Sequence, residues 1–399
     1  MFVYLSCLLP FQHHKILGSN GHNVNEMQIS QIIVWICFSL LSIMWVRYYF
    51  AKNSIFEIPR SEKQPSNERI LAILPFRNEE SVINKSLQRV ISEISSNKNC
   101  KLILVNSASD DNSVDIVMKT IRESYLNSDM WSLIHVDVPG KGIALNKAML
   151  NYEKGDIIVM IDADVQIPKG TFETFRELMS NEEIGAISGQ ESILPNHPMA
   201  NYKTRSNKIR IFESSAGHCP ILEGSLLAWS PSRIEWSSFD EGTNADDAQI
   251  AFCTIRSGHR SHVTNELQFC SLRDPKKASF MRSIRRSQGL NKQLLQNIDL
   301  LWNKRSRRFR STMLFNILLH IIIPWCVITL LFAPLVFIQN PQLILNSINL
   351  LSFSPSFLIV ISLLTNSGRT LLLGSLASIL GQCRALLRIR SSHWGPGEG

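Results

Sequence analysis

The sequence predicts an α/β domain, built as a mostly parallel β-sheet with helices on both faces, together with about three transmembrane helices. Between residues 69 and 162, short apolar runs alternate with segments that carry apolar residues at helical spacing. Strands that are apolar on both faces and alternate with helices are typical of parallel sheets covered on both sides. Long runs without a charged residue lie on either side of this region, and such runs are typical of membrane-spanning helices.

The first uncharged run extends from Gln28 to Val46. A helix of this length covers roughly the 30 Å thickness of the hydrocarbon core of a bilayer. A late signal peptide is the alternative, but the run starts far from Met1 and no small-residue cleavage pattern follows it. We therefore expect an N-terminal segment at residues 1–27, an uncleaved span at 28–47 and a polar linker at 48–67.

An α/β domain is expected at residues 68–275. Apolar runs that end in polar turns predict its strands, and the amphipathic segments between them predict its helices. The expected elements alternate as strand and helix, starting with a strand, over residues 69–75, 79–96, 101–106, 114–121, 131–136, 144–152 and 156–162. Ligands bind beyond the carboxyl ends of parallel strands, so we expect the site at the polar clusters 76–80, 106–113 and 162–164.

The remaining chain is expected to associate with the membrane. Residues 276–310 are basic, and the leucines of 289–302 share one helical face, which predicts a helix at the membrane interface or one packed on the domain. A second span is expected at 311–339. Residues 343–390 are expected to hold a third span, and their later part, Leu371 to Leu387, is either interfacial or the lower part of a span.

The distribution of charge predicts orientation and partners. The net charge is +8, and the basic excess lies beside the second span, which favours anionic lipid or a lipid phosphate over nucleic acid. Basic residues near span ends are retained in the cytoplasm, and those at 47–52, 304–308 and 384–390 all place the middle region there. The sequence thus predicts a multi-pass protein of the plasma or inner membrane. Its cysteines lack CxxC spacing, which indicates buried thiols, neither zinc ligands nor a disulfide framework.

Asp162 and Asp164 flank Ala163 directly after the last of these strands. Two carboxylates on a turn at a strand end are suitable ligands for Mg²⁺ or Mn²⁺, which often take only one or two ligands from protein and the rest from phosphates and water. A solvated acidic turn is the alternative, because such pairs are frequent by chance. A nucleoside diphosphate leaving group needs such a cation, so the pair predicts a site for both.

A series of motifs gives this site its context. In chain order they are ILPFRNEE at 73–80, LVNSASDDNS at 104–113, GKGIALNK at 140–147, GDIIVMIDAD at 155–164, LEGS at 222–225 and ADD at 245–247. In this order and spacing the chain resembles the family 2 glycosyltransferases, inverting enzymes with the Rossmann-like GT-A fold, over about half its length. The position of the domain between spans resembles the membrane-bound branch that includes cellulose, hyaluronan and polyprenyl-phosphate sugar synthases.

The resemblance implies roles for individual residues in binding the donor. Asn106 takes the place of an aspartate that faces the base, and its amide can still form hydrogen bonds, although a preference for uracil no longer follows. Lys141 either approaches the diphosphate or is a solvated loop lysine, and Asp111 is a turn residue rather than a ligand. The nucleotide-sugar-binding residues are expected to be Pro75, Asn78, Glu79, Asn106, Lys141, Asp162 and Arg286, with Asp164 and Asp162 as metal ligands.

The pair Asp246–Asp247 resembles the family's Glu-Asp pair, whose second acid is the catalytic base. An incoming hydroxyl must lose its proton as it attacks, which requires a carboxylate near the anomeric carbon. Two acids at a helix start can also simply complement the helix dipole. The resemblance implies that Asp247 is the base and that Gly224, Ser225 and Asp246 line the acceptor site.

Arg286 lies where processive members of the family carry a QxxRW motif. Here Ser283 and Ser287 replace the glutamine and the tryptophan. The arginine can still bind a diphosphate, whereas the missing tryptophan argues against processive polymer synthesis.

The sequence therefore predicts an inverting glycosyltransferase that uses Mg²⁺ or Mn²⁺ and a nucleotide-sugar donor. Its acceptor is expected to be lipid-linked or a growing glycan at the cytoplasmic face, and nucleic acid is not expected as a partner. The alternative is a catalytically silent membrane protein that keeps the fold as a binding or scaffolding module. Such a protein would be free to lose Asp164 or Asp247, and both are present. A dinucleotide-dependent oxidoreductase is remote, because no GxGxxG follows the first strand.

Overall fold

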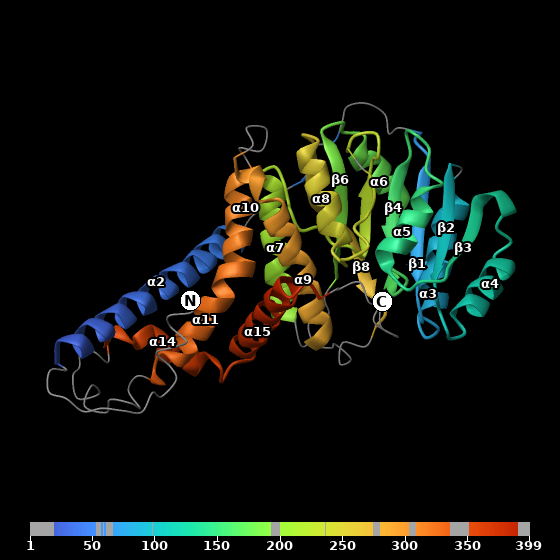
Figure 1. The fold of residues 1–399 in the computed structure, drawn as a ribbon. Helices are drawn as coiled ribbons and strands as arrows, with labels where there is room; N and C mark the ends of the chain where they lie inside the picture. The colour runs from blue at the N-terminus through green and yellow to red at the C-terminus, as the bar shows by residue number, and fades with distance from the viewer. Residues whose placement is uncertain are drawn as a thin grey trace.

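The structure is a computed structural model that describes residues 20–52, 57–58, 60, 67–97, 99–192, 200–235, 237–273, 280–302, 309–335 and 351–389. It contains an α/β domain and a group of apolar helices that extends away from one side of that domain (Figure 1). The strand β3 and the helix α4 lie at the far end of the domain from these helices.

Within the described residues one eight-stranded sheet has the order β3-β2-β1-β4-β7-β6-β8-β5. The strands are β1 Ile70–Phe76, β2 Cys100–Ser107, β3 Trp131–Val136, β4 Ile157–Ile161, β5 Val165–Gln166, β6 Ile184–Glu191, β7 Leu226–Trp229 and β8 Arg260–Ser271. The helices of the domain are α3 Ile83–Ser96, α4 Ser113–Glu123, α5 Lys141–Met149, α6 Thr171–Met179, α7 Ala200–Ser215, α8 Asp246–Arg256 and α9 Phe280–Gln296, with short 3₁₀ turns η1 Ser128–Met130 and η3 Ile298–Leu301.

The sheet is mixed, and its parallel pairings outnumber its antiparallel ones. Strands β3, β2, β1 and β4 run parallel, as the strand and helix alternation predicts. Strand β7 runs antiparallel to both of its neighbours, β4 and β6, and β5 runs antiparallel to β8. A buried strand reads as a continuous apolar run in either direction. The apolar sequence of β7 therefore does not show whether the strand runs parallel or antiparallel to its neighbours.

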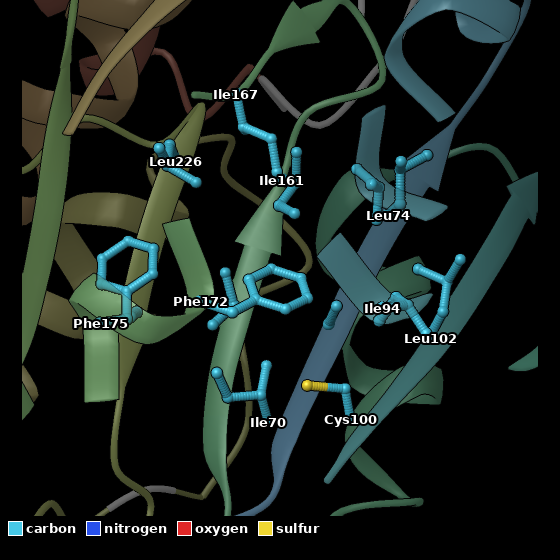
Figure 2. Packing of buried hydrophobic residues seen from close by; sticks show 14 of the residues in the cluster. Ile70, Leu74, Ile94, Cys100, Leu102, Ile161, Ile167, Phe172, Phe175 and Leu226 are labelled. Carbon is cyan, nitrogen blue, oxygen red and sulfur yellow. The ribbon is translucent and has the colours of Figure 1, made fainter. Parts of the chain in front are cut away.

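Alternate residues of β1 enter two separate cores, one on each face of the sheet. Ile70 and Leu74 belong to the core that contains the buried faces of α3, α4 and α6. Leu71 and Ile73 belong to the core on the other face, formed with α5 and α8. Figure 2 shows part of the first core, where Phe172 of α6 lies between strands of the sheet and its own helix. The period of two along the strand thus accounts for helices on both faces.

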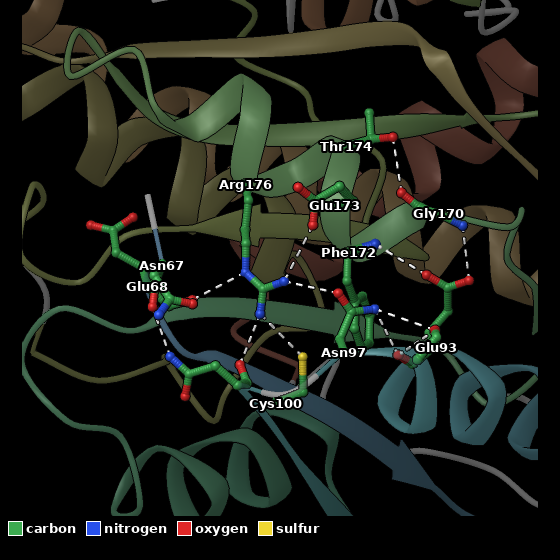
Figure 3. A network of polar contacts seen from close by, with 12 residues as sticks. Asn67, Glu68, Glu93, Asn97, Cys100, Gly170, Phe172, Glu173, Thr174 and Arg176 are labelled. Carbon is green, nitrogen blue, oxygen red and sulfur yellow. Dashed lines mark hydrogen bonds and ion pairs between the residues drawn. The ribbon is translucent and has the colours of Figure 1, made fainter. Parts of the chain in front are cut away.

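A polar network secures the amino ends of β1 and β2, at the edge of the sheet opposite the polar clusters (Figure 3). Arg176 of α6 donates to the carbonyl oxygens of Glu68 at 3.2 Å and Asn99 at 2.9 Å. The buried carboxylate of Glu93 accepts from the backbone N–H groups of Gly170 and Phe172, at 2.9 and 3.3 Å, at the start of α6. This network fixes α3 and α6 to the sheet and leaves the carboxyl edge free for other groups.

The apolar group contains α2 Asn20–Lys52, α10 Phe309–Ile317, the π-helical turn η5 Leu318–Ile322, α11 Ile323–Phe332, α14 Ser354–Ser362 and α15 Asn366–Leu386. In the described part of the chain, Gln28–Ala51 and Phe309–Phe332 are each long and apolar enough to cross a membrane. Helices α14 and α15 meet at a bend of 102°, so they form one broken span or a re-entrant loop. This gives two or three candidate spans. Residues 276–279 and 303–308 of the expected basic stretch lie outside the described residues, as do residues 336–350.

The domain and the apolar group share a hydrophobic core. This junction core contains residues of α8, α9, η3 and α10, namely Ala245, Ala248, Phe252, Ile255, Leu294, Leu300, Leu301, Phe309 and Met313. Helix α9 also packs along α15, as Figure 1 shows. The leucines expected on one face of residues 289–302 thus divide: Leu294 is buried in the junction core, whereas Leu295 is exposed.

Candidate functional site

The polar clusters expected at the site follow the carboxyl ends of β1, β2 and β4. These three strands are neighbours and run parallel, so their ends meet at one edge of the sheet. Pro75 lies near the end of β1, where it pairs with Val105 of β2. The pairing of β1 with β4 stops earlier, at Ile73 and Met160, so the proline lies beyond it.

Asn78 joins the turn after β1 to the turn after β2. Its backbone has a φ of 54°, a left-handed conformation that asparagine tolerates better than most residues. Its side-chain amide donates to Asp110 Oδ1 at 2.5 Å and accepts from the Asp110 backbone N–H at 2.9 Å. The amide of Asn78 is therefore engaged within the protein, where it fixes the shape of both turns.

Asp111 and Ser113 complete this connection. Asp111 accepts from the backbone N–H groups of Ser113 at 3.0 Å and Glu80 at 3.1 Å. The hydroxyl of Ser113 accepts from the backbone N–H of Glu79 at 2.7 Å. Asp111 therefore stabilises the turn, as expected. The bond from Ser113 fixes the backbone of Glu79, whose buried side chain belongs to the site.

Asn106 is buried at the end of β2 with both ends of its amide engaged. Its oxygen accepts from the backbone N–H of Ser109 at 3.0 Å, and its nitrogen lies 3.2 Å from Nδ1 of His135. His135 belongs to β3, so the amide links adjacent turns and strands of the sheet. A base contact by Asn106 stays a prediction.

A chain of acidic and basic side chains crosses the edge of the sheet. Lys141 Nζ lies 2.8 Å from Asp162 Oδ1 and 3.0 Å from Asp246 Oδ2. Arg273 forms ion pairs with Asp164, at 2.5 Å from Nε to Oδ2, and with Glu79. The order of groups is Asp246, Lys141, Asp162, Asp164, Arg273 and Glu79. We call this set the charge chain.

Lys141 is a buried, paired cation and does not match the solvated loop lysine left open as an alternative. It begins α5 and its side chain is 18% exposed. Burial lowers the pKa of Lys141, but the carboxylates of Asp162 and Asp246 outweigh burial and raise it above its usual value. The lysine therefore remains charged at any physiological pH.

Arg273 was not among the expected site residues. It follows β8, and the preceding residue, Leu272, donates its backbone N–H to the carbonyl oxygen of Asp164 at 2.8 Å. Burial raises the pKa of Glu79 to about 8, and Arg273 opposes this effect. Burial also raises the pKa of Asp164, with a further contribution from Asp162 and opposing ones from Arg273 and Arg286. Asp162 and Asp164 thus lie close enough to Glu79 to raise its pKa further, and Arg273 opposes this effect.

Asp162 and Asp164 are two neighbouring carboxylates, which suits a divalent cation. In the structure Asp162 pairs with Lys141 and Asp164 pairs with Arg273. Among the described residues no group of three or more His, Cys, Asp or Glu side chains converges on a common point. A Mg²⁺ or Mn²⁺ ion held here would therefore take its other ligands from a diphosphate and from water, as Mg²⁺ often does.

Asp247 lies at the start of α8, next to Asp246 of the charge chain, and is partly buried. Its Oδ1 accepts from the backbone N–H of Ala248 at 2.8 Å. Burial raises the pKa of Asp247 to about 7, and the charge of Asp246 adds to this shift. A carboxyl group with this pKa exchanges protons readily near neutral pH.

The segment Leu222–Ser225 connects Asp247 to the turn that holds Asp162 and Asp164. A Cβ on Gly224 would lie 3.3 Å from Cβ of Asp247, so the absence of a side chain gives Asp247 its space. The carbonyl oxygen of Ser225 accepts from the backbone N–H of Asp162 at 3.1 Å. Asp246, expected in the acceptor site, is buried against Lys141 instead of facing open space.

Arg286 is exposed on α9, and its charge acts on the site at a distance by lowering the pKa of Asp164. Helix α9 touches the loop before α8 closely: a Cβ on Gly289 would lie 2.8 Å from Asn244 Oδ1 and 3.1 Å from Ala245 Cβ. The structure thus brings together Gly224, Ser225, Asp246, Asp247, Lys141, Asp162, Asp164 and Glu79. It leaves Arg286 at the margin.

The sequence is similar to known glycosyltransferases. Residues 71–213 match the model of glycosyl transferase family 2. A probable glycosyltransferase of Bacillus subtilis (strain 168), YdaM, is 27% identical over 174 residues, which are 42% of this chain and 40% of that protein. The chain thus spans less than half the length of this curated relative.

The fold resembles that of a solved mannosyltransferase, PcManGT from Pyrobaculum calidifontis, whose structure contains GDP-Man and Mn²⁺. The TM-score is 0.74 at 20% identity, over 91% of this chain and 99% of the other. At this identity the likeness shows a shared GT-A-like fold. Residues 71–213 are thus similar to the family 2 glycosyl transferases and lie within a domain of this fold.

Proposed function

We propose that the protein is an inverting, metal-dependent glycosyltransferase that moves a sugar from a nucleotide-sugar donor to a membrane-associated acceptor at the cytoplasmic face. The observation that carries this proposal is the position of Asp247. It is a partly buried carboxyl group with a pKa of about 7, beside Gly224 and next to one end of the charge chain.

The donor is proposed to bind along the edge formed by β1, β2 and β4. Pro75, Asn78, Glu79 and Asn106 are the proposed residues around the base and ribose. Lys141 and Arg273 are cations that now pair with acids, and a bound diphosphate can share them without a buried charge left unpaired. Arg286 adds a third positive charge from α9.

Asp162 and Asp164 are proposed to hold Mg²⁺ or Mn²⁺, which would neutralise negative charge on the departing diphosphate. PcManGT was solved with GDP-Man and Mn²⁺, which supports a similar donor and ion here. Because Asp162 also binds Ser225 through its backbone, the donor end of the site is tied to the acceptor end.

Asp247 is proposed to act as general base. As the acceptor oxygen forms its bond to the anomeric carbon, the bond from that carbon to the diphosphate oxygen breaks, and the proton of the acceptor moves to Asp247. Attack from the side opposite the leaving group inverts the anomeric centre. Gly224 leaves room beside Asp247, and Ser225 and Asp246 are proposed to line the acceptor site next to it.

The acceptor is proposed to be lipid-linked or a glycan held at the membrane. The candidate span Phe309–Phe332 supports this, because the junction core attaches it to α8, the helix that begins with Asp246 and Asp247. The other candidate span, Gln28–Ala51, packs against α11. Arg47, in the last part of α2, packs over the ring of Phe315 at 4.3 Å. A basic residue at this end of the span supports a cytoplasmic domain.

The test is turnover by the purified protein in lipid. The protein would be incubated with a panel of nucleotide sugars, Mg²⁺ or Mn²⁺ and a native lipid extract, and nucleoside diphosphate release and labelled product would be followed. We expect turnover with at least one donor, and its loss in Asp164→Asn and Asp247→Asn. Asp115→Asn, an exposed acid on α4, is the control and should match the wild type.

The silent alternative predicts a different result. A binding or scaffolding module would bind a nucleotide sugar without releasing a diphosphate. Absence of turnover with every donor, or full turnover by Asp164→Asn and Asp247→Asn, would contradict the proposed function.

A further inference from the structure

Helix α7 carries a buried cation that the proposed reaction does not use. The side chain of Arg210 is 19% exposed and forms an ion pair with Glu223. Burial lowers the pKa of Arg210, but Glu223 outweighs burial and raises it above its usual value, and Asp247 also contributes. Arg210 is therefore a permanent positive charge within electrostatic reach of the proposed base.

Glu223 stands directly before Gly224 in the chain, and Gly224 contacts Asp247. The backbone N–H of Glu223 donates to the hydroxyl of Ser188 on β6 at 2.9 Å. Its carboxylate reaches α7 through Arg210. The segment is thus fastened on two sides, by β6 through its backbone and by α7 through its side chain.

The spacing at Gly224 makes Asp247 sensitive to the position of this segment. A Cβ on Gly224 would lie 3.3 Å from Asp247 Cβ and 3.5 Å from its Oδ2. A small shift of the segment toward α8 would therefore displace the carboxylate. Misplacement of a reacting group by about 1 Å can cost about 100-fold in rate.

Charge adds to this dependence on position. Glu223 is one of the groups that raise the pKa of Asp247. As long as Arg210 pairs with Glu223, a cation lies beside these two acids. Without it, Glu223 would be an unpaired acid next to the base.

Helix α7 is itself held at the next turn. Glu213, whose side chain is 1% exposed, accepts from Asn316 Nδ2 of α10 at 2.8 Å and lies 3.6 Å from Arg47 of α2. The helix that presents Arg210 is therefore fixed by both candidate spans.

We propose that Arg210 is a positioning residue of the transfer reaction: by holding Glu223 against α7, it keeps the Glu223–Ser225 segment and the carboxylate of Asp247 in place. This rests on the proposed role of Asp247 as base. Arg210 does not touch the reacting atoms in this proposal. It acts through Glu223.

The test compares Arg210→Met, Arg210→Lys, Glu223→Gln and the double variant Arg210→Met/Glu223→Gln in the turnover assay. The matched control is Lys203→Met, which removes another ion pair of α7, the one with Glu191. For each variant kcat, KM for donor and acceptor, and the pH dependence of kcat are measured. Thermal unfolding reports whether the variant is folded.

We expect Arg210→Met to lower kcat about 10- to 100-fold with little change in either KM. The acidic limb of its pH profile should move to higher pH, because Glu223 then stands unpaired beside Asp247. Arg210→Lys should recover part of the loss. The double variant should lose no more than Arg210→Met alone, since residues that act through one contact are not additive. Lys203→Met should match the wild type.

Other outcomes would overturn the proposal. If Arg210→Met raises the KM for the acceptor and leaves kcat unchanged, Arg210 binds the acceptor directly. If the losses of the single variants multiply in the double variant, Arg210 does not act through Glu223. If Arg210→Met does not fold, Arg210→Lys and the double variant decide by the same criteria.

The assay also separates this inference from the proposed function. Turnover that Asp247→Asn abolishes and Arg210→Met leaves intact would overturn the inference alone. Absence of turnover by the wild type would overturn both.

Discussion

The pKa and the ion pairing of each acid at this site depend on the charged groups around it. Asp246 and Asp247 are adjacent in sequence, yet Asp246 pairs with Lys141, whereas Asp247 accepts from the backbone N–H of Ala248 and forms no ion pair within the described residues. Burial raises the pKa of both carboxyl groups. Because Lys141 pairs directly with Asp246, we propose different roles for the two acids: Asp246 holds a cation and Asp247 acts on the acceptor.

The raised pKa of Asp247 predicts a pH dependence of the rate. A general base acts in its deprotonated form, and with a pKa of about 7 that form increases from a minor to a major fraction between pH 6 and pH 8. We expect kcat to rise over this interval and then to level. Initial rates at saturating donor and acceptor would measure this.

A rate that is flat from pH 6 to pH 8, with the protein folded throughout, would contradict the assignment of Asp247 as base. Asp247→Asn is the companion variant, and any residual rate it retains should lack this limb.

The sequence could place some residues at the carboxyl edge of the sheet and could not place others there. Asp162 and Asp164 could be placed at the edge of the sheet because an apolar strand precedes them and a parallel strand brings its carboxyl end to the ligand side. Arg273 and Arg210 could not be predicted in this way. Each lies on an element whose position over the site depends on tertiary packing, and an arginine has the same local pattern whether it meets solvent or a carboxylate.

At the scale of elements, helix packing in this protein depends on close backbone contacts. A Cβ on Gly381 of α15 would lie 2.8 Å from the backbone nitrogen of Gln288 and 3.0 Å from the carbonyl oxygen of Ile284, both on α9. Gly374 of the same helix has nothing within 4 Å of such a Cβ. The two glycines therefore form a matched pair for testing the contact between α9 and α15.

We expect Gly381→Ala to destabilise the protein by about 1–3 kcal/mol, because the added methyl group meets backbone atoms that cannot move aside cheaply. Gly374→Ala should be neutral or stabilising by about 1 kcal/mol, since alanine favours a helix over glycine. Thermal unfolding of both variants in the same detergent would measure this. Equal effects would show that α9 and α15 do not approach as described.

The contact between α7 and the candidate spans predicts a pH-dependent stability. Burial raises the pKa of Glu213 to about 7, from an ordinary value of 4.5, despite Arg47 and Asn316. A raised folded-state pKa contributes stability that is fully present below the ordinary value and is lost as pH rises through the folded value. That contribution is on the order of 3 kcal/mol, and it should fade between pH 4.5 and pH 7.

Glu213→Gln isolates this contribution, because glutamine keeps the shape and does not titrate. The difference in unfolding free energy between wild type and Glu213→Gln should change in favour of the variant as pH rises from 4.5 to 7. A difference that does not depend on pH would contradict the burial of an ionisable carboxyl group at this position.

The direction of individual elements was less predictable than their existence. The apolar periodicity predicted β1, β2, β3 and β4 to within about a residue or two. It did not predict that β7 enters between β4 and β6 in the opposite direction. The neighbours of a strand depend on tertiary packing. Because every residue of β7 is buried, its sequence has no polar face that would indicate its direction or its neighbours.

For the whole molecule, the expected topology can be tested directly. Tyr125 is 94% exposed and follows α4, which lies at the far end of the domain from the apolar group (Figure 1). An epitope inserted after this residue should be inaccessible to antibody in intact cells and accessible once the membrane is permeabilised, if the domain is cytoplasmic. The same epitope at the N-terminus, expected outside, is the control. Labelling after Tyr125 in intact cells would overturn the proposed orientation.

The junction core has a practical consequence for isolating the enzyme. Phe252 on α8 packs with Phe309 of the second candidate span, and their ring centroids lie 6.3 Å apart. A fragment that ends before Phe309 would expose Phe252, Leu294 and Leu300 to water, directly behind the residues proposed for catalysis. Such a fragment should aggregate, because contiguous exposed apolar surface promotes association. We therefore expect purification and kinetics to require the full chain in detergent or lipid. Under these conditions the apolar helices are covered and the junction core behind α8 stays intact.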